Sequence, residues 1–310
     1  MSNEISRLEI LPNELFLHVF RYISSTDLFQ IFFFLNSRFH FLLQTFPYLS
    51  FTPSIDINEN HLSFPYIRAL IINRGIPIDF HRFTQIRFLI LRFPTETSID
   101  QFNPLILPSL EHFRLNHIHS SLTYRIPRLC EKIFTDRFPR LISCYLFQWG
   151  SISPTTSWTF SVLKILKIGS IDLFTYKTIL SICPNLFSLQ CATIRPNSTH
   201  LSIASHRTLK RLIIKTTTYI PACEDDELRI CLSLLPHLEY LRIYRSDCSS
   251  SNLLNCQWLA CSLPCLYQLD YFCHIDDHRK TLHASEMTAI QKKFTQAHRR
   301  QSYQSRLIFF

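Results

Sequence analysis

A six-residue phrase that recurs nine times between residues 67 and 271 constrains the fold of this chain more than any other feature. The phrase consists of an aliphatic residue, two variable residues, an apolar residue, one variable residue and a second apolar residue. Its copies begin at Ile67, Ile86, Leu110, Leu141, Leu163, Leu186, Leu209, Leu238 and Leu266. Successive copies start 19 to 31 residues apart, close to the spacing of stacked repeats that contribute one strand each. We therefore expect nine short parallel strands whose fixed apolar residues point into a common core.

The segments between the phrases carry helix signals. Proline stands two residues before the phrase in six copies, where it ends a helix and favours extended backbone, at Pro65, Pro108, Pro139, Pro184, Pro236 and Pro264. Apolar residues recur at helical spacing over residues 173–183 and 228–235. The 19 residues between Ile67 and Ile86 leave room only for a loop or a single turn. The alternative is an unrelated α/β protein in which the phrase arises by chance.

The phrase, its period and the sequence Cys183-Pro184-Asn185-Leu186 resemble the irregular, cysteine-containing type of leucine-rich repeat over residues 64–279. This resemblance implies an α/β solenoid, a right-handed leucine-rich-repeat array of about nine repeats. Residues 280–310 leave the pattern, and a basic helical C-terminal cap or tail is expected there from the spacing of Met287, Ile290, Phe294 and Ala297. The closing residues 307–310 are expected to dock on that cap, or to mark a chain that continues.

Residues 8–46 lack the phrase and carry a different signal. Pro12, followed by Leu15, Val19 and Ile23 at intervals of four, predicts an amphipathic helix. Residues 24–27 supply a break and a new N-cap, after which a short second helix and a third helix at about 37–45 are expected. Three helices this small bury too little surface to be stable alone, so such a unit packs on something else.

This N-terminal run closely resembles the F-box, through Leu11-Pro12-Asn13-Glu14-Leu15, the later Asp27-Leu28 and the closing basic-aromatic pair Arg38-Phe39. The resemblance implies a three-helix F-box over residues 1–50, followed by a linker over 51–63. In F-box proteins these elements dock on a Skp-type adaptor and, through it, on a cullin. The implied adaptor-binding residues are Leu11, Pro12, Leu15, Val19, Ile23 and Leu28. The alternative is a helical cap that shields the first repeat and has no adaptor partner.

The variable residues of the phrases are expected on the concave face, as in leucine-rich-repeat proteins. Here these positions are rich in Lys, Arg and aromatic residues, which are typical of protein contact surfaces. We predict that an acidic or phosphorylated protein substrate binds there, because guanidinium groups match the geometry of carboxylates and phosphates. The candidate substrate-binding residues are Arg92, Arg114, Tyr145, Lys167, Arg211, Lys215, Tyr240, Arg242 and Tyr244. Alternatively, they are ordinary solvated side chains of a basic protein.

Composition excludes several other classes of protein. A hydrophobic content of 46% over 310 residues excludes general disorder, and the longest apolar run is far shorter than a membrane span. The N-terminus has no signal-peptide pattern, and eleven scattered cysteines then indicate reduced thiols in the cytoplasm and/or nucleus. Only three glycines occur, so nucleotide-binding glycine loops are absent.

No motif for catalysis or for a cofactor is found, and we expect neither. A zinc site could be assembled from Cys248, Cys256, Cys261, Cys265, Cys273, His274 and His278, but their spacings contain no CxxC pair, so no metal is expected. The sequence therefore predicts a non-catalytic substrate-recognition subunit of an SCF-type ubiquitin ligase. The alternative is a protein-interaction scaffold. The net charge of +9 allows nucleic acid as its partner, but an acidic protein explains that charge equally well.

Overall fold

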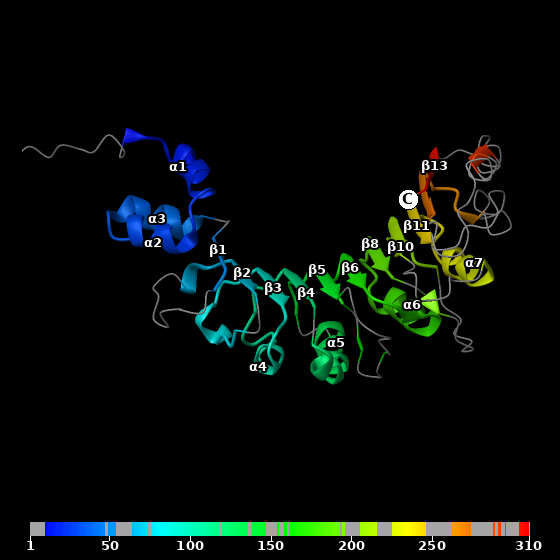
Figure 1. Ribbon diagram of the computed structural model, residues 1–310, viewed down its shortest axis with the longest axis horizontal. Helices are drawn as coiled ribbons and strands as arrows, with labels where there is room; N and C mark the ends of the chain where they lie inside the picture. Colours follow the sequence, from blue (N-terminus) through cyan, green and yellow to red (C-terminus); the bar gives the residue numbers. More distant parts are fainter. Residues whose placement is uncertain are drawn as a thin grey trace, which may run out of the picture. The chain divides into compact units, whose positions relative to one another are not determined.

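The computed structural model describes residues 10–46, 49–53, 64–73, 76–117, 119–135, 138–146, 154, 158–159, 161–192, 194–195, 205–215, 225–245, 262–273, 288, 291–292, 295 and 304–309. The chain forms two compact units, residues 1–122 and 123–310. Each unit is of the α/β type, with parallel strands in a linear order that does not close into a barrel (Figure 1). Within the described residues, no helix is both long enough and apolar enough to cross a bilayer.

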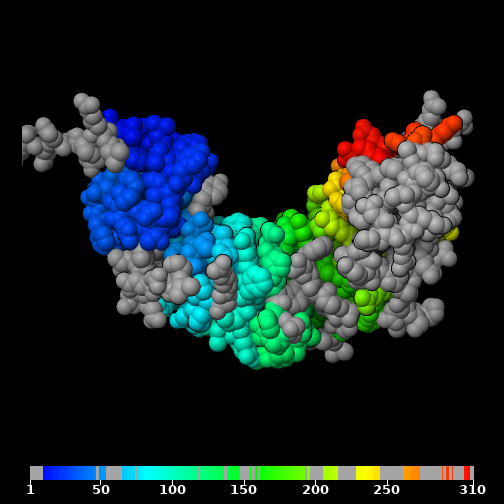
Figure 2. All heavy atoms as spheres, viewed as in Figure 1, coloured from blue at the N-terminus to red at the C-terminus, as the bar shows by residue number. Residues whose placement is uncertain are grey.

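The first unit begins with three short helices, α1 (Asn13–Phe20), α2 (Ser25–Phe32) and α3 (Ser37–Thr45). Pro12 stands at the N-cap of α1, where its missing N–H costs no hydrogen bond. The side chains of Ser24 and Asn36 cap α2 and α3 by accepting hydrogen bonds from the backbone N–H of Asp27 and Phe39. The three helices occur where the sequence predicts them, and in the space-filling view they form one closely packed block (Figure 2).

Phenylalanines make up much of the core of this block, together with Leu28, Leu42 and Leu43. Phe16 and Phe20 are the buried residues of α1, and the ring of Phe16 meets that of Phe39 edge-on at 4.9 Å between centroids. Phe20 packs on Phe32 at 5.1 Å and on Phe46 at 5.8 Å. The sequence predicted Leu15, Val19 and Ile23 as the apolar stripe of this helix, but Leu15 and Val19 are 48% and 49% exposed. The predicted apolar stripe is present on α1, but it lies on the exposed side of the helix, whereas Phe16 and Phe20 form the buried side.

Four parallel strands follow in the first unit, in the order β1 (Ser50–Phe51), β2 (Ala69–Ile72), β3 (Phe88–Arg92) and β4 (His112–Asn116). The described parts of their connections contain the 3-10 turns η2 (Phe64–Tyr66) and η3 (Phe80–Arg82) and the five-residue helix α4 (Glu96–Asp100). The single turn between β2 and β3 is what the 19-residue interval predicts. The helices attach to these strands through the side chain of Arg68, which donates to the carbonyl of Gln44 at 3.1 Å, and through Ser25, which donates to the carbonyl of Ser50.

The second unit contains seven parallel strands in the order β5, β6, β8, β10, β11, β12 and β13. Their bounds are β5 (Ser143–Leu146), β6 (Ile165–Ile168), β8 (Ser188–Cys191), β10 (Arg211–Lys215), β11 (Tyr240–Arg245), β12 (Gln268–Cys273) and β13 (Gln304–Phe309). A small pair, β7 (Ile171–Asp172) and β9 (Ile194–Arg195), lies apart from them. The 3-10 turn η4 (Ser120–Arg125) leads into α5 (Ile126–Phe134), and α6 (Leu173–Ile182) and α7 (Asp225–Ser233) lie on the same side of the strands as α5 (Figure 1).

Each of the nine phrases contains one strand, in the register that the pattern predicts. In the second unit Leu189 pairs with Leu166 and Leu212, and Leu241 pairs with Leu212 and Leu269, so the fourth position of the phrase forms one continuous buried row. The predicted apolar faces of α6 and α7 are buried as well. Five of the six cysteines whose side chains are described, Cys130, Cys144, Cys183, Cys191 and Cys231, are buried as thiols. They act as small hydrophobic residues, as expected.

The C-terminal segment agrees with its prediction in one part and differs in another. The described residues 288, 291–292 and 295 are helical, within the helix that was expected there. Residues 304–309 instead form β13, which pairs in parallel with β12 over six residues, where the basic helical cap or tail over 280–310 was expected to continue. The register places Ser305 opposite Leu269, and Ser302 stands where the phrase would begin. With serine at two of its three fixed positions, this strand does not match the phrase. The proposed helix residues Met287, Ile290, Phe294 and Ala297 lie outside the described residues.

Candidate binding surfaces

Helix α1 presents a second apolar stripe to solvent. Leu11, Leu15, Val19 and Tyr22, which we call the α1 stripe, follow one another at intervals of three or four residues and are all exposed. Because Phe16 and Phe20 already fill the buried face, this stripe has no place in the core of the block. A helix that is apolar on both faces is typical of a buried helix, and apolar patches left exposed mark interaction sites.

Arg38 of α3 fixes the segment that enters α1. Its Nε donates to Asn13 Oδ1 at 2.8 Å, and its Nη2 donates to the carbonyl of Leu11. The guanidinium carbon also lies 5.4 Å from the centroid of the Phe16 ring, within range of a cation–π contact. The residues Leu11 and Pro12 are thus held by a charged side chain from the third helix, which lies 26 or more positions later in the sequence.

The other implied adaptor-binding residues lie around a pocket of about 360 Å³ in the first unit. Its lining residues are Phe20, Arg21, Ile23, Ser25, Leu28, Phe46 and Ser50. Ile23 is half-buried, and Leu28 is only 1% exposed. Of the six implied residues, Leu11, Pro12, Leu15 and Val19 are exposed, whereas Leu28 is a buried residue of α2.

The sheet of the first unit carries two of the candidate substrate-binding residues. Arg92 on β3 and Arg114 on β4 are exposed, and Arg114 Nε donates to Asn116 Oδ1 at 3.1 Å. Phe88 on β3, which the sequence did not single out, stacks on His112 with ring centroids 4.3 Å apart. Burial lowers the pKa of His112, only partly offset by the charge of Glu111, which favours an uncharged imidazole against the Phe88 ring.

The remaining seven candidates share one face of the second unit's sheet, and many form cation–aromatic pairs between neighbouring strands. Lys167 Nζ lies 4.5 Å from the Tyr145 ring centroid, and these residues are register partners on β6 and β5. Arg211 and Lys215 of β10 lie 4.8 and 5.2 Å from the rings of their register partners Tyr240 and Tyr244 on β11. The variable positions therefore make contacts across the sheet among themselves.

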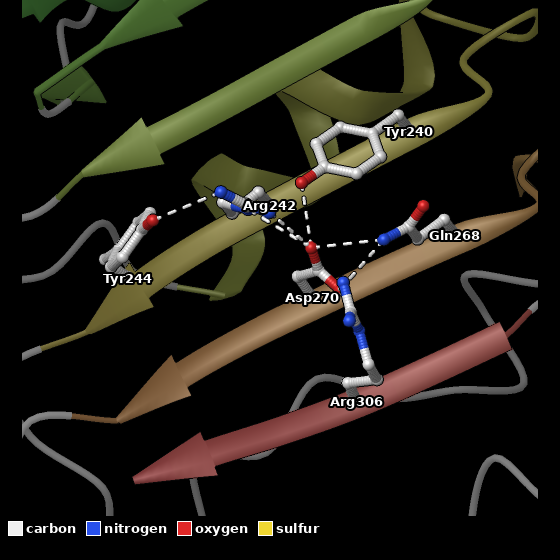
Figure 3. Close-up of polar contacts among 6 residues, drawn as sticks. All are labelled: Tyr240, Arg242, Tyr244, Gln268, Asp270 and Arg306. Atoms are coloured by element: carbon white, nitrogen blue, oxygen red, sulfur yellow. Dashed lines mark hydrogen bonds and ion pairs between the residues drawn. The ribbon is translucent and has the colours of Figure 1, made fainter. Parts of the chain in front are cut away.

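A buried carboxylate organises the last strands of this face (Figure 3). Asp270 on β12 is completely buried and accepts hydrogen bonds from Tyr240 Oη at 2.8 Å and from Gln268 Nε2 at 3.2 and 3.3 Å. Arg242 of β11 donates to it through Nε and Nη2, at 3.2 and 2.8 Å. Arg306 of β13 donates through Nε and Nη2, both at 2.8 Å.

These donors determine the protonation of the cluster. Burial by itself raises the pKa of Asp270, but the hydrogen bonds from Arg306, Arg242, Tyr240 and Gln268 outweigh it and hold that pKa well below its usual range. Burial and the hydrogen bond to Asp270 raise the pKa of Tyr240 to about 12. The carboxylate is therefore ionised and the phenol protonated throughout the physiological pH range.

Sequence reasoning found the basic and aromatic residues of this face but not how they are connected. It treated Arg242 as a guanidinium directed at a substrate, whereas the Nε and Nη2 of Arg242 are bonded to Asp270. It did not include Arg306, because β13 was not expected. The signal that could have found the cluster is Asp270 itself, an acidic residue between the two inward-pointing apolar positions of the last phrase, where the two preceding phrases have Ile213 and Arg242.

No metal-binding group of three or more His, Cys, Asp or Glu side chains occurs in the part of the chain that the structure describes. Most of the residues from which a zinc site could be assembled, Cys248, Cys256, Cys261, His274 and His278, lie outside that part. Cys265 is exposed, and its Sγ lies 3.8 Å from His237 Nδ1. No protein-family model matches the chain, and no curated protein matches its sequence.

Proposed function

We propose that this chain is the substrate-recognition subunit of an SCF-type ubiquitin ligase and contributes no catalytic group itself. Residues 1–50 act as an F-box that docks on a Skp-type adaptor and, through it, on a cullin. The strands and helices that follow act as a leucine-rich-repeat array that binds the protein to be ubiquitinated, in the cytoplasm and/or nucleus.

The observation that carries this proposal is the exposed α1 stripe beside a separate aromatic core. A helical cap that only shielded the first strand would bury its apolar face against that strand. Here the residues that resemble the F-box opening, Leu11, Pro12 and Leu15, are exposed, and Arg38 and Phe39 of the resembling basic-aromatic pair hold α1 in place. An apolar surface kept in position by a separate core is suited to a permanent protein partner.

The second support is the arrangement of the nine phrases. The nine strands run parallel to their neighbours, with the apolar residues of the phrase inward and the variable residues outward. Leucine-rich-repeat proteins use this architecture to present a broad recognition face. The outward residues are charged and aromatic, which suits the recognition of another protein.

Co-expression with a Skp-type adaptor tests the proposal. We expect the wild-type chain to co-purify with the adaptor as a 1:1 complex and the Leu15→Asp, Val19→Asp double variant to lose it. Both residues are about half exposed, so a charge there removes apolar contact area without disturbing the core.

Leu105→Asp is the matched control, because Leu105 is an apolar residue of the same unit that is 88% exposed and lies outside the helices. This variant should retain the complex. If the wild-type chain did not bind the adaptor, the proposal would be wrong, and the chain would be an interaction scaffold with a helical N-terminal cap.

A further inference from the structure

The strongest unexplained feature of the second unit is a carboxylate that binds two arginines. Asp270 is completely buried, whereas the side chains of Arg242 and Arg306 are 27% and 57% exposed. One arginine is enough to neutralise a carboxylate, and a buried ion pair is seldom retained for stability alone. The second arginine leaves the cluster with one surplus positive charge, carried by groups that reach solvent.

The surplus of positive charge extends over the four strands β10, β11, β12 and β13. We call this surface the β10–β13 face, and its residues are Arg211, Lys215, Tyr240, Arg242, Tyr244, Gln268, Asp270, Phe272 and Arg306. Its charged residues are four cations, Arg211, Lys215, Arg242 and Arg306, against the single carboxylate of Asp270, so its net charge is four minus one, or +3. Alternation along the strands places all of them on the side opposite the buried leucine row. The face therefore attracts negative charge.

The aromatic side chains of this face argue against nucleic acid as the ligand. Proteins that bind single strands stack bases on open aromatic faces. Tyr244 lies between Phe272, stacked at 4.4 Å, and Lys215 at 5.2 Å on the strand at its other side. Tyr240 is covered by the guanidinium groups of Arg211 and Arg242, at 4.8 and 5.3 Å. These rings hold the cations in place and are not available to stack on bases.

The distribution of the cations argues for several separate carboxylates. Arg211, Arg242 and Arg306 stand on β10, β11 and β13, and adjacent strands lie about 4.8 Å apart. Such a spread suits a run of Asp and Glu side chains, because each carboxylate can meet a different cation. A single phosphate would instead be held by cations that converge on one point, and the point on which Arg242 and Arg306 converge is already occupied by the Asp270 carboxylate.

We propose that the β10–β13 face binds an acidic, Asp- and Glu-rich segment of a partner protein, and that Asp270 is a positioning residue that holds Arg242 and Arg306 toward that segment. The identification of this partner as the ubiquitination substrate rests on the proposed function. The binding itself does not. The C-terminal strand belongs to the site, because β13 supplies Arg306.

Fluorescence anisotropy with labelled twelve-residue peptides tests the acidic preference on the full chain. The probes are a peptide with four Glu in a Ser/Ala background, the same peptide with four Gln, the same peptide with four phosphoserines, and a dT12 oligonucleotide. We expect the Glu peptide to bind at least tenfold more tightly than the Gln peptide and than dT12, and no more weakly than the phosphopeptide. Equal binding of the Glu and Gln peptides, or clear preference for phosphopeptide or dT12, would overturn the proposal.

Arg306→Gln should weaken binding of the Glu peptide at least fivefold. The matched control is Arg207→Gln, which removes the same charge from an exposed residue outside the strands and should leave binding within twofold. If the two variants weakened binding equally, only the net charge of the protein would matter, and the assigned site would be wrong.

Asp270→Asn separates positioning from charge, because it raises the net charge of the face while loosening both arginines. Positioning predicts weaker binding in spite of the added positive charge, and Asp270→Glu should restore part of the affinity. Tighter binding by Asp270→Asn would show that the carboxylate only opposes the ligand. Near-UV circular dichroism checks that each variant is folded, and Arg306→Lys provides a milder perturbation of the same contact.

The two proposals fail separately. Adaptor co-purification of Arg306→Gln should equal that of the wild type, because Arg306 and the α1 stripe lie in different units. A chain that bound the Glu peptide but no adaptor would keep the acidic-segment site and lose the ligase role. A chain that bound the adaptor but did not distinguish the Glu and Gln peptides would do the reverse.

Discussion

The α1 stripe and the β10–β13 face are both candidate surfaces for protein binding, yet they are built in opposite ways. The α1 stripe exposes apolar side chains above a core of aromatic rings and leucines, whereas the β10–β13 face exposes charges whose neighbours on adjacent strands already bind them. Apolar association is nearly insensitive to salt and favours stable complexes. Charged association is fast, selective and weakened by salt.

This difference matches the two kinds of partner that a substrate-recognition subunit requires. A permanent adaptor suits the apolar surface, and exchangeable targets suit the charged face. The comparison therefore predicts which substitutions should alter stability and which should alter binding.

The largest effect on stability is expected beneath the α1 stripe. Phe20→Ala removes a ring that is 1% exposed and packs on Phe32 and Phe46, so it should lower the free energy of unfolding of the helical block by about 3–5 kcal/mol. Leu15→Ala, in the stripe itself, should change it by less than about 0.5 kcal/mol. Amide hydrogen exchange of residues 13–45 measures both values.

A Leu15→Ala variant that destabilised the helices as much as Phe20→Ala would break the comparison, because the stripe would then belong to the core. If Leu15→Ala instead lost adaptor binding but kept the hydrogen-exchange protection of residues 13–45, the exposed face of α1 would serve binding and the buried face stability.

The second effect concerns Asp270. Asp270→Asn keeps the shape of the side chain but leaves two arginines without a charged partner. We expect a loss of about 2 kcal/mol at pH 7, below the usual cost of breaking a buried pair because Arg306 is more than half exposed.

The pH dependence of this loss has a definite sign. The pKa of Asp270 in the folded protein lies well below its usual range, so its contribution is complete above about pH 4, the value in unfolded chains, and falls away as the pH decreases toward the folded-state pKa. The difference in urea unfolding free energy between wild type and Asp270→Asn should therefore be about 1 kcal/mol smaller at pH 3 than at pH 7. An equal difference at both pH values would show that the carboxylate does not contribute as an ion.

The sequence predicts the nine phrase strands because their alternation directly encodes burial. In each copy the fourth and sixth residues of the phrase point inward and the fifth points outward, and a shift by one residue would place Leu212 or Leu241 in solvent. The helices α6 and α7 follow from the same kind of periodicity. Local pattern is sufficient wherever one face of an element is apolar and the other is polar.

The features that the sequence did not predict are those that depend on packing or pairing with neighbouring helices and strands. In α1 the pair Phe16 and Phe20 and the pair Leu15 and Val19 have the same spacing, and only the packing of α2 and α3 selects which is buried. Strand β13 has serines at fixed positions and is formed by pairing with β12. The burial of Asp270 depends on Arg306 of that strand, so missing the strand also hid the cluster.

The smallest effect is expected at the other end of the second unit's sheet, where Lys167 lies 4.5 Å from the Tyr145 ring. Because both side chains are only partly buried, we expect their cation–π coupling to be about 0.5–1 kcal/mol. A double-mutant cycle of Lys167→Met and Tyr145→Leu, followed by thermal unfolding, measures this coupling without the effects of each substitution alone. A positive coupling would show that this pair, like those of the β10–β13 face, is held together before any partner binds, so that recognition needs little reordering of side chains. A coupling of zero would restrict such preorganisation to the strands around Asp270. The partner segment would then be recognised only across the four strands of the β10–β13 face.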